Sequence, residues 1–184
     1  MKPYIFLIGS LNILTLQNNF GQSNLLLTQI NVLNKVSNIP FDNSKNPWQD
    51  CGDEIIWTIA VQGESAIEPL IKKIADTSFT NLYFKDYSNK IRLRVGDIAY
   101  ITLEQILFIP TFTIANVQFD VGIYGGYQSG FFEYLNSFSN RIKFQKQLDN
   151  YYRTNKFKLV LFNKNEMQIK ACAISHNIKG RFDK

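Results

Sequence analysis

The chain has 184 residues, of which 45% are hydrophobic, and a formal net charge of +5. This length suits one domain with a hydrophobic core and excludes an array of several ordinary domains. The charge is uneven, because residues 139–184 hold 11 Lys and Arg against 3 Asp and Glu, whereas residues 1–138 hold 9 against 12. We therefore expect a basic surface toward the C-terminus.

The N-terminus has the order of regions typical of a secretory signal. Lys2 precedes about a dozen mostly apolar residues, and the polar segment 17–23 follows them. The apolar stretch is shorter than the roughly 20 residues that a membrane-spanning helix needs. We expect residues 1–22 to be a signal peptide and residues 23–184 to form a single domain. The mature protein would then be periplasmic or extracellular, without a membrane span.

Two helices are predicted in the first part of this domain, on either side of a loop. Apolar residues recur near helical spacing over residues 25–36, before a proline. Prolines and turn-forming residues predict a loop over residues 38–50. The next helix is predicted to be capped by Gly52 or Asp53, to carry one apolar face and to end at Gly63.

A third helix is predicted directly after this turn. Ser65 and Glu68 have the spacing of a capping box, in which the Ser side chain accepts from a backbone amide and the Glu side chain reaches back. The helix would begin at Ser65, carry Pro69 in its first turn and end over residues 76–78. Two helices joined by so short a turn are expected to pack antiparallel.

The segment from Val61 to Asp76 resembles the inner half of a HEAT-type repeat, in which a Gly ends the first helix and the second reads Ala-Ile-x-Pro-Leu-Ile. Residues 95–107 resemble the first helix of a following repeat, and Ala99 is small where two helices approach. The resemblance implies packed helical pairs and a role as an interaction scaffold. Residues 80–94 depart from the repeat, because alternating apolar and basic residues around a turn predict an inserted β-hairpin.

The C-terminal half alternates irregular and regular segments. Glycines among aromatic residues predict irregular structure over residues 111–130, and a short helix is predicted over residues 131–136. A longer helix is predicted from Ser139, as N-cap, to near Asn155, and residues 156–162 predict a short strand. The predicted fold class is therefore mainly α, with antiparallel helical pairs of HEAT-like type, a small β-hairpin insertion and a short C-terminal strand region.

Cys51 and Cys172 are the two cysteines of the chain. In an exported protein an even number of cysteines favours a disulfide, and here a single pairing exists. The alternative is a pair of buried free thiols. A bond between them would close a loop that the chain-entropy description associates with about 4–5 kcal/mol of stabilisation.

The carboxylates Asp50, Asp53 and Glu54 and the single histidine, His176, are the candidates for chemistry. Two carboxylates at the right separation hydrolyse a glycosidic bond, but a position at a helix N-terminus favours capping instead. Cys172 and His176 have helical spacing, yet two ligands make no structural zinc site, so a hydrogen-bonded or surface histidine is favoured. No catalytic residue, metal site or cofactor is predicted.

A glycine-rich segment at residues 121–127 lacks the Gly-Lys-Ser/Thr ending of a phosphate-binding loop. Four aromatic residues in or beside it would suit a sugar-stacking platform, although packing in the core or loop is the favoured interpretation. These residues are Tyr124, Tyr127, Phe131 and Phe132.

The leading functional hypothesis is a non-catalytic exported interaction or structural protein. Its basic residues would contact a protein or an acidic envelope component, or would form a solvated surface; export disfavours nucleic acid. The candidate basic binding face comprises Lys143, Lys146, Arg153, Lys156 and Lys158. The alternatives are a small cell-envelope hydrolase acting on a glycan through carboxylates near residues 50–54, and an inhibitor or immunity-type partner of a secreted protein.

Overall fold

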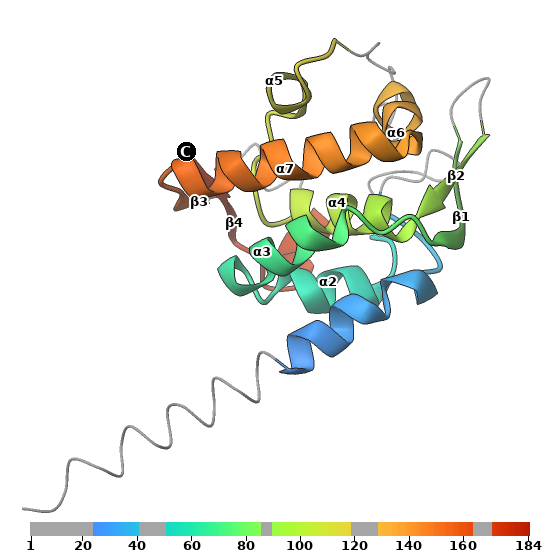
Figure 1. The fold of residues 1–184 in the computed structure, drawn as a ribbon. Helices are drawn as coiled ribbons and strands as arrows, with labels where there is room; N and C mark the ends of the chain where they lie inside the picture. Colours follow the sequence, from blue (N-terminus) through green and yellow to red (C-terminus); the bar gives the residue numbers. More distant parts are fainter. Residues whose placement is uncertain (1–23, 41–50, 86–89, 119–128, 164–170) are drawn as a thin grey trace, which may run out of the picture.

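The computed structural model describes residues 24–40, 51–85, 90–118, 129–163 and 171–184 (Figure 1). It is mainly helical and has two small antiparallel strand pairs, so the predicted fold class is confirmed at this level. The predicted signal peptide, most of the predicted loop before Cys51 and the glycine-rich segment lie outside the described residues. Within the described ranges, no helix is both long and apolar enough to cross a membrane.

The chain begins with helices, the β1–β2 pair separates α3 from α4, and the β3 and β4 strands lie on either side of α9 near the C-terminus. Residues 24–31 are helical and lead into a short 3-10 turn, η1 (Leu33–Lys35). The α-helices are α2 (Glu54–Ala60), α3 (Glu64–Lys73), α4 (Val95–Glu104), α5 (Thr111–Ala115), α6 (Ser129–Asn136), α7 (Phe138–Thr154) and α9 (Ala171–Ser175). The strands are β1 (Phe79–Lys85), β2 (Lys90–Arg94), β3 (Lys158–Leu161) and β4 (Gly180–Asp183).

Asp53 is the N-cap of α2, as the sequence predicts. One carboxylate oxygen accepts from the backbone N–H of Ile55 at 2.9 Å, and the other accepts from the backbone and hydroxyl of Ser37 at 2.9 and 2.7 Å. Gly52 has a φ of +71°, and a Cβ there would lie 2.5 Å from the backbone nitrogen of Pro40. This junction therefore requires glycine and ties the N-terminal segment to α2.

The predicted capping box of α3 is wrong. The helix begins at Glu64, with Gly63 as N-cap, and the hydroxyl of Ser65 donates to the backbone oxygen of Gln62 at 2.9 Å. Gly63 has φ +58° and ψ −130°, a conformation almost restricted to glycine, so the chain reverses before Ser65. As a consequence, Pro69 lies inside the helix and not in its first turn.

The helix α4 forms the centre of the core. Its residues are almost all buried, and it packs against α2, α3 and η1 (Figure 1). The ring of Tyr100 lies 4.7 Å from that of Phe131 and 5.9 Å from that of Phe144, between ring centroids, which joins α4 to α6 and α7. Phe131 and Phe132 are both buried, so these two aromatic residues pack in the core.

A buried ion pair joins four helices. Arg141 of α7 donates from Nη2 to Asp97 of α4 at 2.6 Å, and both side chains are at most 1% exposed. The same guanidinium donates from Nε to the backbone oxygen of Leu135 at 2.9 Å and from Nη1 to that of Ile74 at 3.0 Å. Burial raises the pKa of Asp97, and the positive charge of Arg141 opposes that rise. Arg141 therefore caps the C-terminal ends of α3 and α6 and pairs with the Asp97 carboxylate at the start of α4.

Gly96 allows these elements to come together. A Cβ at this position would overlap the backbone oxygen of Ile74 and would lie 2.5 Å from Nη1 of Arg141. The backbone N–H of Gly96 donates to Asp76 O at 3.0 Å, so the start of α4 approaches the end of α3 directly. Gly96 is thus a close approach between two helices that the sequence analysis did not identify, and Ala99, one turn later, is also fully buried.

Two boundaries in the C-terminal half differ from the predictions. The long helix α7 begins at Phe138 after Ser137, because Ser137 has the extended backbone of an N-cap and Ser139 is already helical. Part of the segment predicted to be irregular forms α5, which ends at Asn116 in the left-handed conformation. The predicted hairpin, the short helix before Ser137 and the terminal strand region are confirmed.

Candidate functional site

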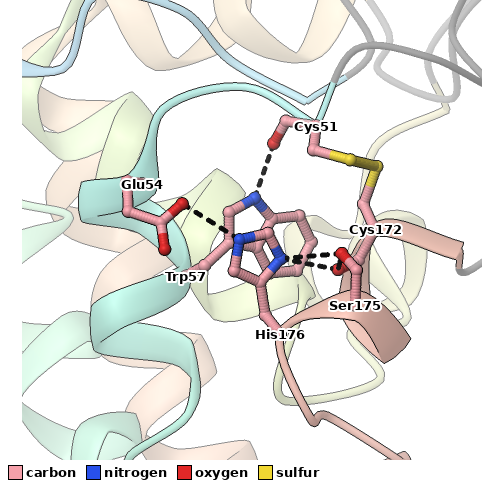
Figure 2. The surroundings of a disulfide bond; sticks show 6 residues. All are labelled: Cys51, Glu54, Trp57, Cys172, Ser175 and His176. Carbon is pink, nitrogen blue, oxygen red and sulfur yellow. Dashed lines mark hydrogen bonds and ion pairs between the residues drawn. A yellow bond between two sulfur atoms is a disulfide. The ribbon is translucent and has the colours of Figure 1, made fainter.

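The predicted disulfide is present and connects two distant parts of the chain. Cys51 lies just before α2 and Cys172 lies in α9, and their Cα atoms are 5.2 Å apart across a sequence separation of 121 residues (Figure 2). The alternative of two free thiols is excluded, because the described residues include no unpaired cysteine. A disulfide of this kind is compatible with an exported protein, since oxidising compartments maintain such bonds.

A histidine–tryptophan stack accompanies this bond. The rings of His176 and Trp57 are 5.0 Å apart at 12°, and the indole N–H of Trp57 donates to the backbone oxygen of Cys51 at 2.6 Å (Figure 2). Nδ1 of His176 lies 2.7 Å from the backbone oxygen of Cys172, and Nε2 lies 3.0 Å from the Glu54 carboxylate. The histidine is therefore hydrogen-bonded, as the sequence favoured, and contacts both sides of the disulfide.

The protonation of His176 follows from these partners. A carbonyl oxygen only accepts, so the hydrogen bond to Cys172 places a proton on Nδ1, and a second proton on Nε2 would be donated to the Glu54 carboxylate. Burial lowers the pKa of His176, but the hydrogen bonds to Cys172 and Glu54 outweigh that effect and raise the pKa above 6.5. At a given pH, folding thus favours the imidazolium form of His176 relative to the unfolded chain.

The stability of the protein should fall as the pH rises through the folded-state pKa of His176. Because that pKa is raised above the unfolded value of 6.5, the contribution is complete below the unfolded value and is lost above the folded one. Urea unfolding between about pH 5.5 and pH 8.5 measures how steeply the free energy of unfolding falls with pH. Glu54→Gln should make this pH dependence weaker, whereas Glu68→Gln, which removes a carboxylate on α3, should leave it unchanged. An unchanged slope in Glu54→Gln would contradict the assignment.

The carboxylates proposed for hydrolysis have structural partners where they are described. Partial burial raises the pKa of Asp53, but its hydrogen bonds to Ser37 and Ile55 outweigh burial and hold the pKa below its ordinary value. Glu54 pairs with His176, and Asp50 lies outside the described residues. Among the described residues, no group of three or more His, Cys, Asp or Glu could hold a metal ion.

The five residues of the predicted basic face are all exposed. Lys143, Lys146 and Arg153 have helical spacing on the outer side of α7, opposite the buried Phe144 and Leu148. Arg153 is engaged in ion pairs, at 2.9 Å to Asp149 and 3.6 Å to Glu68. Lys156 and Lys158 lie beyond the end of α7, where β3 begins, so the five side chains run from the helix onto this strand.

The most unusual surface feature is β3 itself. Leu159, Val160 and Leu161 are 56, 49 and 64% exposed, and all four residues of the strand are on the surface. Three consecutive apolar residues would suit a strand buried on both faces, so the sequence gives no sign of this exposure. Their exposure results from the position of the β3–β4 ribbon at the end of α7 (Figure 1).

One edge of β3 is unpaired among the described residues. β4 lies between β3 and residues 106–108, since Phe182 exchanges backbone hydrogen bonds with Ile106 and Phe108 at 2.7 and 2.8 Å. The backbone N–H of Phe162 donates to Lys179 O. In an antiparallel pair, successive residues of a strand direct their backbone groups alternately toward and away from the partner strand. Val160 therefore bonds to β4, and the backbone groups of Leu159 and Leu161 point outward. The outer edge thus offers both donors and acceptors.

No protein-family model, curated protein or solved structure matches the chain. The resemblance of residues 53–107 to HEAT-type repeats therefore stays a prediction. The disulfide, the basic residues and the outer edge of β3 are the features from which a function can be argued.

Proposed function

We propose that this is an exported, non-catalytic interaction protein and that β3 is its principal interface. The observation that carries the proposal is a strand with three consecutive exposed apolar side chains and an unpaired outer edge among the described residues. Proteins usually protect such edges, because an exposed strand pairs readily with another chain. Here the apolar character favours a recognition surface that is covered when the partner binds.

Strand addition is the mode of recognition that suits this geometry. The outward backbone groups of Leu159 and Leu161 would hydrogen-bond to an extended segment of the partner, and the side chains of β3 would pack against the partner's alternate residues. Such binding requires no catalytic group and no cofactor. An inhibitor or immunity-type protein would use the same surface, since its partner is also a protein.

The charge around β3 favours an acidic partner over a second copy of this chain. Lys156 and Lys158 immediately precede the apolar residues of β3. On the paired side, Lys179 lies beside β4 and Arg181 within it, and Asp183 is the one carboxylate of β4. Two copies meeting edge to edge would bring like charges together, whereas an acidic segment would neutralise them. The proposed partner is therefore a protein with an exposed extended segment that alternates apolar and acidic residues.

A pair of synthetic peptides tests this proposal. A peptide alternating Val and Glu should bind, and a matched peptide alternating Val and Lys should not, as measured by fluorescence anisotropy and by amide shifts at β3. Leu159→Thr with Leu161→Thr should weaken binding at least about tenfold, because each buried Leu contributes about 1–2 kcal/mol. Val61→Thr, at a residue exposed on another surface, is the control.

Two results would contradict the proposal. One is equal binding of both peptides, and the other is binding that the β3 substitutions leave unchanged. Concentration-dependent dimers in analytical ultracentrifugation that disappear in the β3 variant would instead identify a second copy as the occupant of this edge.

A further inference from the structure

The β1–β2 hairpin carries aromatic rings and cations together on its outer face. Ile91 and Leu93 of β2 point into the core, so the alternate residues Lys90, Arg92 and Arg94 lie on the opposite face. The rings of Phe79 and Tyr83 from β1 share that face, at 53 and 41% exposure. We call Phe79, Tyr83, Lys90, Arg92 and Arg94 the hairpin face.

The cations of the hairpin face lie over its rings. The guanidinium carbons of Arg92 and Arg94 are each 4.8 Å from the centroid of Phe79, and Nζ of Lys90 is 4.0 Å from that of Tyr83. Arg92 is fixed further by donating from Nε to the backbone oxygen of Thr80 at 2.9 Å. Stacking on a ring leaves the edge of a guanidinium available to anions, so these charges are held in place without being neutralised.

Carboxylates do not balance this charge within the described part of the chain. None of Lys90, Arg92 and Arg94 forms an ion pair there. The Asp97 carboxylate, buried with Arg141, accepts from the backbone N–H of Arg94 at 2.7 Å and also attracts the charge of this half-buried arginine. The exposed charge of the face thus comes mainly from Lys90 and Arg92. Counted over the described residues, the hairpin face is therefore net positive, and an anionic ligand would complement it.

A third exposed ring lies near the hairpin face, at the start of α7. Phe138 is 63% exposed. It follows two residues after Asn136, whose backbone oxygen lies 3.5 Å from Nη2 of Arg94. A soluble anionic polymer is hydrated and offers exposed rings little apolar surface to pack against. At a membrane interface, by contrast, rings enter the boundary region while cations bind the headgroups.

We infer that the hairpin face, with Phe138, attaches the protein peripherally to an anionic lipid bilayer. This inference goes beyond the proposed binding at β3 and uses a separate surface. The two surfaces lie at opposite ends of α7 (Figure 1), a helix of 17 residues and hence about 25 Å long. That separation exceeds the screening length of about 8 Å at physiological salt, so the charges of one surface barely affect the other.

Vesicle sedimentation with the full mature chain tests the inference. Binding should occur to vesicles of phosphatidylcholine mixed with phosphatidylglycerol, should fail with phosphatidylcholine alone and should weaken as salt rises. Each cation near an anionic bilayer strengthens partitioning roughly fivefold, so Lys90→Gln with Arg92→Gln should weaken it about 30-fold. Lys156→Gln with Lys158→Gln removes the same charge at β3 and should leave vesicle binding within about twofold.

The aromatic contribution separates a bilayer from a soluble polyanion. Phe138→Ser should weaken vesicle binding about tenfold, because an exposed ring loses its apolar environment, but should not alter binding of polyglutamate. In Phe138→Trp, the added indole emission should shift to the blue with anionic vesicles. An unshifted emission, or vesicle binding unchanged by Lys90→Gln with Arg92→Gln, would overturn the inference. Polyglutamate binding with the same dependence on Phe138 would identify a polymer site instead.

The two proposals fail independently in these experiments. Lys156→Gln with Lys158→Gln should weaken binding of the acidic peptide and spare the vesicles, and Lys90→Gln with Arg92→Gln should do the reverse. Lys156→Gln with Lys158→Gln replaces exposed side chains and should leave the free energy of unfolding within about 0.5 kcal/mol of wild type. Lys90→Gln with Arg92→Gln also removes the hydrogen bond from Arg92 to Thr80 O and should cost about 1–3 kcal/mol, so a single cooperative urea transition in both variants is the check that excludes misfolding.

Discussion

Replacing Arg141 by methionine is expected to lower the free energy of unfolding by about 3–5 kcal/mol. The substitution leaves Asp97 buried without its counter-charge, and it removes the donors to the backbone oxygens of Leu135 and Ile74. An uncompensated buried charge and two orphaned carbonyl groups are each costly in a water-excluded interior. Urea unfolding followed by circular dichroism measures the loss.

An arginine on the same helix supplies the control. Arg153→Met removes exposed ion pairs with Asp149 and Glu68, which solvent screens, and should cost much less than Arg141→Met. A double variant, Arg141→Met with Asp97→Leu, should recover part of the stability, since the unpaired carboxylate is gone. If Arg141→Met cost no more than Arg153→Met, Arg141 would not join α3, α4 and α6 as described.

Reduction of the Cys51–Cys172 bond should be similarly destabilising, by about 4–5 kcal/mol less any strain that the bond introduces. The bond spans 121 residues, and in the chain-entropy description a cross-link over so long a loop removes much of the freedom of the unfolded chain. The prediction is checked by urea unfolding with and without a phosphine reductant, and by intact mass, in which the bonded form lacks two hydrogens.

The variant Cys51→Ala with Cys172→Ala separates the bond from other effects of the reductant. It should have the stability of the reduced protein and should not respond to reductant. It should also weaken the contact between His176 and Trp57, because α9 would lose its covalent attachment to the start of α2. A wild-type free energy of unfolding in this variant would show that the bond does not constrain the unfolded chain.

The features that the sequence predicts correctly depend on local chemistry. The side chain of Asp53 caps α2 through an amide two residues away, and the β-hairpin follows from a period of two. For the disulfide, two cysteines allow a single pairing, but the sequence left two free thiols open because it does not give the distance between Cys51 and Cys172. The error at Ser65 is also local, since the pattern of a capping box does not reveal that Gly63 adopts a positive φ and starts the helix earlier.

Other features depend on which surfaces meet, and residue types do not reveal that. Arg141 counts toward the basic C-terminal segment in the sequence, yet its side chain is fully buried. Leu159, Val160 and Leu161 suit a buried strand by composition, yet tertiary structure leaves them on an outer edge. The stack of His176 on Trp57 joins residues far apart in the sequence, so no spacing rule could have found it.

The disulfide also determines how the fold responds to mechanical force. If the chain is pulled from residues 24 and 184, tension passes from Cys51 directly to Cys172 through the sulfur atoms. The segment between them contains α2 to α7 and the strands β1 to β3, and it cannot be extended by the pull while the bond is intact, although β4 would be pulled from β3 and the N-terminal segment from α4. About 120 residues, or roughly 400 Å of extended chain, are thereby excluded from extension. In a tethered molecule the hairpin face would lie within the segment that the bond protects from extension, whereas β3 would lose its pairing with β4 when the C-terminus is pulled away.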